Sequence, residues 1–228
     1  METRSDDRRR WPWFAGLALW LATLAALAPF DLAISRTVAR TEHWFGCLVQ
    51  DHGTNPALVL YLALIAWLAV PAWRRTSRLV SRGASAVLVQ ALLHTLAVTT
   101  GLKHVWGRIR FADLGPDGSG FAPLWAPDFL GGGLSFPSGH VATAFVLAPA
   151  VVLLARAGRP RAALALGATV IAFGLAVAVG RITFGAHYAT DAVFSIGLAW
   201  LIAPLSIALG DRYLALFERR DPAATGGG

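Results

Sequence analysis

The sequence predicts an all-α fold, a bundle of six helices that span a membrane. Of the 228 residues, 56% are hydrophobic and only 14% are charged, so the chain is more apolar than an ordinary soluble domain. The apolar residues gather in six stretches, and most basic residues lie in every second connection between them. This length and pattern indicate one multi-pass membrane domain.

The first apolar stretch, residues 11–30, has the length of a membrane anchor and carries no charge. A bilayer core about 30 Å thick needs roughly 20 helical residues. A signal peptide is the alternative, because basic residues precede the stretch and Ala26-Leu27-Ala28 resembles a cleavage site. The stretch exceeds the roughly 7 to 15 apolar residues of such peptides. Pro29 also makes a poor cleavage point, so a retained anchor is favoured.

Five further apolar stretches follow at residues 56–73, 84–102, 141–155, 162–180 and 192–209. The fourth of the six is short for a full span, and Leu134, Phe136 and Pro137 ahead of it extend its apolar reach. We therefore expect an N-terminal tail over residues 1–10, a six-span domain over 11–210 and a C-terminal tail over 211–228.

Two connections are long enough to contribute to a site. Residues 31–55 mix apolar and polar side chains, which suits either a short interfacial helix or an ordered loop. Residues 103–138 are rich in Gly and Pro, with Gly131-Gly132-Gly133 near their end. We expect this second connection to cover a site.

The positions of the basic residues predict the orientation, because short cytoplasmic loops carry an excess of Lys and Arg. Fourteen of the 20 basic residues fall in the two termini and in two of the connections. They are Arg4, Arg8, Arg9, Arg10, Arg74, Arg75, Arg78, Arg82, Arg156, Arg159, Arg161, Arg212, Arg219 and Arg220. We expect both termini to be cytoplasmic in a cell (inner) membrane, with the other connections on the periplasmic or extracytoplasmic side.

Two other classes of protein are disfavoured. The net charge of +7 also suits a nucleic-acid-binding protein, but the loop bias accounts for most of it, so we expect no nucleic-acid partner. Cys47 is the only cysteine, which excludes an internal disulfide and cannot build a zinc site alone. The sequence does not indicate an oligomeric state.

Three polar segments lie where apolar stretches meet the outer side. The last of them holds His187 and Asp191, which are four residues apart and share a face if the sixth helix includes both. A carboxylate that holds a histidine by its ring N–H is a nucleophile or base arrangement. A helix-capping Asp beside an unrelated His is the alternative.

The second polar segment is Phe136-Pro137-Ser138-Gly139-His140. It opens the fourth helix, where free backbone N–H groups favour an anion. Ser138 adds a hydroxyl donor, Gly139 permits close approach, and His140 is placed to give a proton to a leaving oxygen. A simple helix cap is the alternative.

The first polar segment holds Lys103, the only lysine of the chain, with Arg108 and Arg110. Arg181 ends the fifth stretch in the same way. Arg binds phosphate oxygens bidentately and Lys acts as a point charge, so these residues suit a phosphate. Anchoring of lipid headgroups is the alternative, but the cluster lies on the outer side, against the loop bias.

In their order and spacing these residues resemble the type 2 phosphatidic acid phosphatase superfamily of integral membrane lipid phosphatases. The family pattern is Lys, six residues, Arg-Pro; then Pro-Ser-Gly-His; then Ser-Arg, five residues, His, three residues, Asp. The chain follows it from Lys103 to Asp191. It departs at Phe111, where proline is expected, and at Gly180, where serine often precedes the arginine.

The resemblance implies a lipid phosphatase with an active site at the outer membrane–water interface. His187 would form a phosphohistidine, Asp191 would stabilise its imidazolium, and His140 would protonate the leaving group. The residues that would bind the phosphate are Lys103, Arg110, Ser138, Gly139 and Arg181. No metal or cofactor is implied, and the acidic residues do not cluster as magnesium ligands would.

The expected partner is a phosphorylated lipid in the outer leaflet, either a phosphate monoester or a pyrophosphate. Undecaprenyl pyrophosphate, phosphatidylglycerol phosphate, phosphatidic acid and lipid A phosphates all fit. Two alternatives remain open: a lipid phosphotransferase that uses the same histidine, and a non-enzymatic protein that binds anionic lipid. The second has no use for His187 and Asp191.

Overall fold

The computed structural model describes residues 3–129 and 131–220, and all regular structure within them is helical. The prediction of six spanning helices is confirmed, since six are long and apolar enough to cross a membrane. These are Trp13–Val38, Trp44–Ala69, Arg78–Asp113, Gly139–Arg156, Pro160–Thr183 and Ala189–Leu216.

Several spans are assembled from shorter helical segments. The first two spans and the connection after them contain α1 (Thr3–Leu27), η1 (Ala28–Phe30), α2 (Asp31–Val38), α3 (Trp44–His52), α4 (Asn55–Ala69) and α5 (Pro71–Thr76). The third contains α6 (Arg78–Gln90), the π-helical η2 (Ala91–Thr99) and α7 (Thr100–Trp106), with η3 (Phe111–Asp113) after it. The last three contain α8 (Gly139–Ala144), α9 (Ala148–Arg156), α10 (Pro160–Thr183) and α11 (Ala189–Arg220).

The connection over residues 31–55 is helical rather than a simple loop. α2 continues the first span beyond the apolar stretch, and α3 follows after a short turn. His43 caps α3, because its Nδ1 accepts a hydrogen bond of 3.3 Å from the backbone N–H of Phe45. α3 packs against α10, so this connection lies on the bundle.

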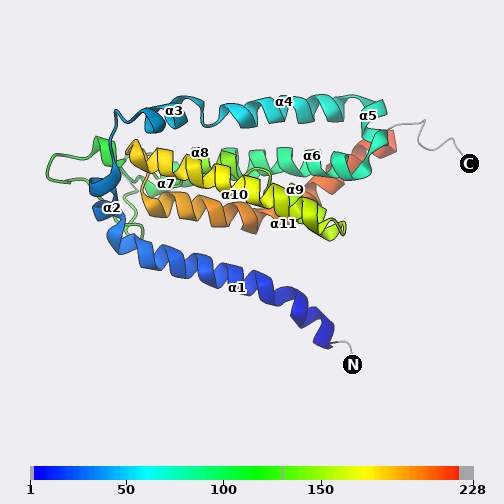
Figure 1. Cartoon of the computed structure of the whole chain (residues 1–228), viewed down its shortest axis with the longest axis horizontal. Coiled ribbons are helices and arrows are strands. Elements are labelled where there is room, and N and C mark those ends of the chain that lie inside the picture. Colours follow the sequence, from blue (N-terminus) through cyan, green and yellow to red (C-terminus); the bar gives the residue numbers. More distant parts are fainter. Residues whose placement is uncertain (1–2, 130, 221–228) are drawn as a thin grey trace, which may run out of the picture.

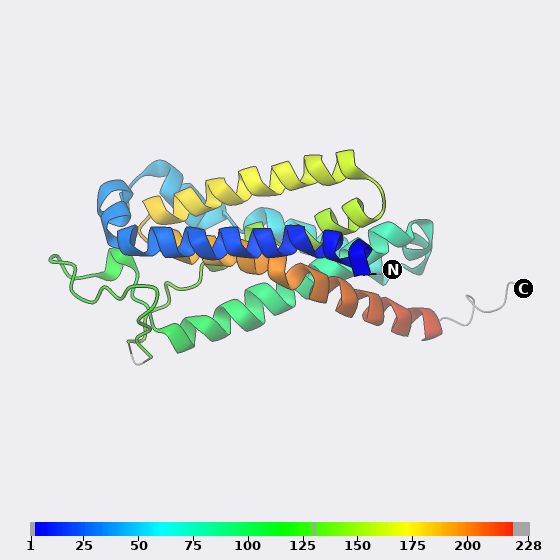
Figure 2. The same cartoon turned by 90° about the horizontal axis from the view of Figure 1, so that it is seen from below.

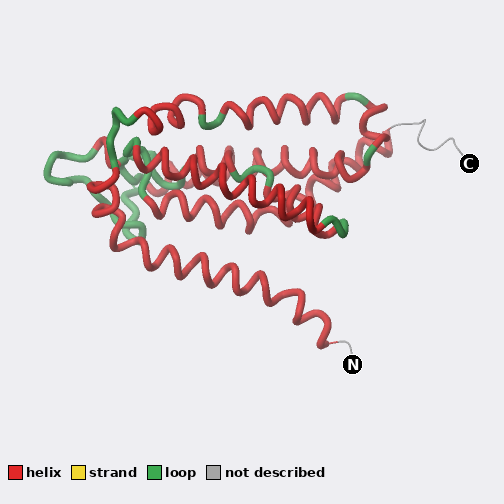
Figure 3. Tube along the Cα trace, in the orientation of Figure 1, coloured by secondary structure: helices red, strands yellow, loops and turns green. Residues whose placement is uncertain are grey.

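The long irregular segments gather at one end of the bundle. Figure 1 shows the start of α1 and the end of α11 at one end, with α2 and the segment between α7 and α8 at the other. Figure 3 shows the loops in green concentrated at that second end. In the orthogonal view of Figure 2, α1 crosses over α11. The polar segments of the sequence therefore meet at a single end.

The interior is packed through small residues and a few polar contacts, as expected where lipid removes the hydrophobic drive between helices. α6 and α11 share the most extensive contact. Buried Gln90 joins them by donating a 2.8 Å hydrogen bond to the carbonyl of Ala199 and accepting one of 2.6 Å from Ser206 Oγ. α1 is attached to α11 by Trp20, whose Nε1 donates to the carbonyl of Val193 at 2.9 Å.

Candidate active site

Five parts of the chain bring the predicted residues to the loop-rich end of the bundle. α7 carries Lys103, the segment after it carries Arg108 and Arg110, α8 follows Ser138, α10 ends after Arg181, and α11 begins just before Asp191. Gly107 ends α7 with a left-handed φ of 63°, and a Cβ there would lie 1.7 Å from the carbonyl oxygen of Asp128. This turn directs the chain back across the end of the bundle.

His187 is almost fully buried, with 2% of its surface exposed. Its Nδ1 lies 2.6 Å from the carbonyl oxygen of Ser135. Because a carbonyl oxygen only accepts, Nδ1 must carry the proton and Nε2 must have the free lone pair. The sequence predicts that Asp191 accepts this N–H. In the structure Ser135 accepts it, and the Asp191 Oδ2 lies 3.7 Å from the same nitrogen.

The electrostatics of the site keep His187 neutral. Burial lowers the pKa of His187 to about 4, and hydrogen bonding and charge from Asp191 oppose only part of this shift. A histidine with a lowered pKa is neutral above that pKa and charged only below it. At neutral pH the Nε2 lone pair is therefore available to attack an electrophile.

We expect the His187 ring to stay neutral, with its proton on Nδ1, from pH 8 down to about pH 5. The measurement is a ¹⁵N NMR titration of ring-labelled protein in detergent micelles, with the His187 signals assigned by their loss in His187→Ala. A titration midpoint near the ordinary value of about 6.5 contradicts both the buried setting and the assigned tautomer.

Asp191 is held by a set of donors that the sequence alone does not indicate. Its Oδ2 accepts from Ser135 Oγ at 2.6 Å and from the backbone N–H of Tyr188 at 2.9 Å, and its Oδ1 accepts from Arg108 Nη1 at 2.6 Å. Asp191 and Ser135 are both completely buried. A buried carboxylate is tolerated when it is fully hydrogen-bonded and paired in this way.

His140 is fixed by a residue that the sequence analysis did not identify, Gln50 of α3. The Nε2 of His140 lies 3.3 Å from the backbone carbonyl oxygen of Gln50, so Nε2 carries a proton and Nδ1 is the nitrogen that can exchange one. The side-chain Oε1 of Gln50 accepts a hydrogen bond from Nη1 of Arg181. One residue of α3 thus connects the predicted general acid to a predicted phosphate ligand.

Glycine lets α3 approach closely enough for this contact. A Cβ at Gly180 would lie 2.6 Å from a side-chain carbon of Val49 in α3, and a Cβ at Gly46 would lie 3.2 Å from the backbone of Phe184. A serine at position 180 would require α3 to move away. The departure from the family pattern at Gly180 therefore accompanies the close packing that places Gln50 beside Arg181.

The predicted cations are gathered and only partly paired. The charges of Arg110, Arg181 and Asp191 act on Lys103, and its Nζ donates to the carbonyl of Leu134. Among the residues that the structure describes, the Nε atoms of Arg110 and Arg181 are buried without a hydrogen-bond partner. Unpaired buried N–H groups on neighbouring guanidinium groups fit a bound oxyanion.

Ser138 and Gly139 lie beside these cations. Ser138 is completely buried, and its Oγ caps α8 by accepting from the backbone N–H of Val141 at 3.5 Å. This leaves the hydroxyl proton free to donate. An ideal Cβ on Gly139 would lie 4.0 Å from Cε of Lys103, so the segment borders the cation cluster. α8 itself extends over only six residues.

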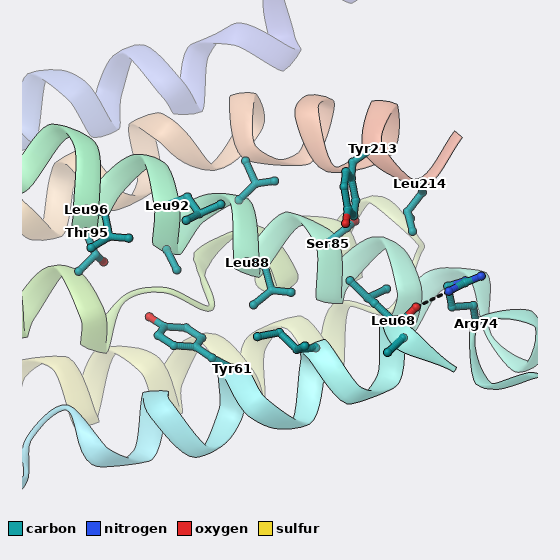
Figure 4. Close-up of a pocket in the computed structure, with 14 residues that line it drawn as sticks. Tyr61, Leu68, Arg74, Ser85, Leu88, Leu92, Thr95, Leu96, Tyr213 and Leu214 are labelled. Atoms are coloured by element: carbon teal, nitrogen blue, oxygen red, sulfur yellow. Dashed lines mark hydrogen bonds between the residues drawn. The ribbon is translucent and has the colours of Figure 1, made fainter. Parts of the chain in front are cut away.

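The site contains no metal-binding cluster in the part of the chain that the structure describes: no three His, Cys, Asp or Glu side chains are grouped to hold an ion. A cavity of about 740 Å³ lies elsewhere, between α4, α6, η2 and α11. Figure 4 shows its mainly apolar lining, with Tyr61, Leu88 and Leu92 among the labelled side chains. None of the predicted site residues lines it.

Comparison with known families gives one match. The model of the PAP2 superfamily matches residues 84–213, a range that contains all three polar segments. No curated protein and no solved structure is similar enough to the chain to count as a match.

Proposed function

Because the chain belongs to the PAP2 superfamily, we propose that it is a membrane lipid phosphatase that forms a phosphohistidine at His187. The proposal rests on one observation: a neutral histidine, held in one orientation by a hydrogen bond, lies in the same site as cations that suit an anion. His187 has its Nδ1 held by the carbonyl of Ser135, and Arg110 and Arg181 have buried N–H groups without partners within the described residues. A phosphate between them would satisfy both.

In the first step Nε2 of His187 attacks phosphorus while the bond to the leaving oxygen breaks. His140 acts here as the imidazolium, protonated on both nitrogens: it gives its Nδ1 proton to that oxygen and becomes neutral, while its Nε2–H stays on the carbonyl of Gln50. Lys103, Arg110 and Arg181 stabilise the charge on the other phosphate oxygens. The product is an alcohol, or a lipid monophosphate when the substrate is a pyrophosphate.

In the second step water attacks the phosphohistidine. His140, now neutral and with a free lone pair on Nδ1, takes a proton from the water. The bond from phosphorus to Nε2 of His187 breaks. Inorganic phosphate leaves, and both histidines return to their starting protonation states. The Asp191 carboxylate, 3.7 Å from Nδ1 of His187, stabilises the positive ring between the two steps.

The test is a panel of lipid phosphates presented to the purified protein in detergent. The panel contains undecaprenyl pyrophosphate, phosphatidylglycerol phosphate, phosphatidic acid and lipid A. We expect inorganic phosphate from at least one of them without added metal. Transfer of the phosphate to an alcohol with no release to water would indicate a phosphotransferase, and no reaction with any member would contradict the proposal.

The proposal places the site on the outer side of the membrane, and single-cysteine labelling tests this. In a Cys47→Ser background, we expect Ser119→Cys, in the exposed segment between α7 and α8, to react with a membrane-impermeant maleimide in intact spheroplasts. Ala157→Cys, exposed between α9 and α10, should react only after permeabilisation. The opposite labelling pattern would reverse the orientation.

A further inference from the structure

Asp31, Arg108 and Asp191 form a buried group of charges, called here the charge triad. Their side chains are 0% exposed. They come from three separated parts of the chain: the start of α2, the segment after α7 and the first turn of α11. Only Asp191 belongs to the catalytic scheme above, which leaves the burial of the other two without a role.

Arg108 lies between the two carboxylates. Its Nη2 donates to Asp31 Oδ2 at 2.9 Å and its Nη1 to Asp191 Oδ1 at 2.6 Å, while its Nε donates to the carbonyl of Ala122 at 2.9 Å. The guanidinium carbon lies 4.0 Å from the centre of the Tyr188 ring. Arg108 is therefore fixed by hydrogen bonds from all three of its guanidinium nitrogens and by a cation–π contact at its face.

Asp31 is held as firmly on the far side of Arg108. Its Oδ1 accepts from the backbone N–H of Thr190 at 3.0 Å, and its Oδ2 also accepts from the Thr190 hydroxyl. That hydroxyl oxygen lies 3.0 Å from Nη1 of Arg108 as well. Asp31 thus contacts the residue next to Asp191 in sequence, and it reaches His187 only through Arg108 and α11.

We propose that Asp31 and Arg108 are positioning residues of the phosphatase, which set the geometry and the charge of Asp191 beside His187. Two carboxylates share one guanidinium, so the triad retains a single net negative charge in a desolvated place. Arg108 alone would neutralise Asp191. The second carboxylate offsets this, and the remaining charge stabilises the positive ring that His187 acquires on phosphorylation. The inference rests on the proposed function.

The first test replaces the Asp31 carboxylate by an amide. We expect Asp31→Asn to lower kcat by roughly 10- to 100-fold, the usual effect of losing a partner that orients a reacting group. KM should stay within about threefold, because Lys103, Arg110 and Arg181 are unchanged. Asp31→Glu should recover most of the lost kcat. Glu42→Gln, the same change at an exposed carboxyl, is the matched control and should behave as wild type.

The second test separates charge from mere packing. Asp31→Asn combined with Arg108→Gln leaves Asp191 as the only charge of the triad, so the single net negative charge returns although further hydrogen bonds are lost. The proposal expects a higher kcat in this double variant than in Asp31→Asn. If Asp31 and Arg108 have a purely structural role, the double variant should have a lower kcat than Asp31→Asn. Thermal unfolding in detergent confirms that each variant is folded.

The outcomes are distinguishable from those of the proposed function. If the wild type releases phosphate and folded Asp31→Asn keeps the wild-type kcat, the role of Asp31 is overturned and the phosphatase stands. The role of Asp31 is also overturned if the double variant folds but has a lower kcat than Asp31→Asn, or if neither variant folds. If the wild type releases no phosphate from any lipid, the proposed function itself has failed.

Discussion

Changing His187 to alanine is expected to lower phosphate release by about four orders of magnitude, close to complete loss. The alanine removes the proposed nucleophile and leaves the cation cluster of Lys103, Arg110 and Arg181 in place. Binding of the lipid phosphate should therefore persist while turnover stops. The measurement is inorganic phosphate release by the purified variant, together with binding of the same lipid substrate.

The control for this variant is His104→Ala. His104 is exposed on α7, one residue from Lys103, and takes no part in the proposed chemistry. This second variant should turn over as the wild type does, which separates loss of the nucleophile from a general effect of removing an imidazole. Unchanged phosphate release by folded His187→Ala would rule out His187 as the nucleophile.

A substitution at His140 should have an effect that depends on the leaving group. His140→Gln can still donate a hydrogen bond to the carbonyl of Gln50, because its amide reaches the position of Nε2, but it cannot give a proton to a leaving oxygen. With a lipid alkyl phosphate we expect kcat to fall by roughly 10²- to 10⁴-fold, the usual contribution of general acid catalysis. The measurement is a comparison of kcat for alkyl and aryl phosphate esters.

With an aryl phosphate, the variant should form the phosphohistidine at a rate much closer to that of the wild type, because the phenolate leaves without needing a proton. A burst of phenolate, followed by slow turnover, is the expected course in His140→Gln, since the proposed mechanism needs the same residue to deprotonate water in the second step. Equal losses for the first step with both esters would show that His140 acts in some other way.

The sequence predicts the number of spans well but not their internal breaks. A membrane span must present about 20 apolar residues to lipid, so its composition is constrained whatever its partners. The point where a span ends depends on tertiary contacts instead. Asp31 looks like the end of the first span, yet α2 continues to Val38. The Asp31 carboxylate can lie buried at that point because Arg108 pairs with it.

The candidate site is predictable to the extent that side-chain chemistry defines it. Histidine, lysine and arginine at fixed spacings indicate a phosphate site before any fold is known. Gln50 and Ser135 leave no such signal, because each acts at least in part through a backbone carbonyl that any residue could supply. Asp31 does leave one, since an ionisable residue beside an apolar stretch demands a partner.

The stereochemical course at phosphorus tests the phosphohistidine at the centre of this account most directly. A lipid phosphorothioate made chiral with oxygen isotopes would be hydrolysed in isotopically labelled water and the configuration of the product determined. Each in-line displacement inverts phosphorus. Attack by His187 followed by attack of water therefore predicts overall retention of configuration. Overall inversion would mean that water attacks the lipid phosphate directly, and it would contradict a phosphohistidine intermediate.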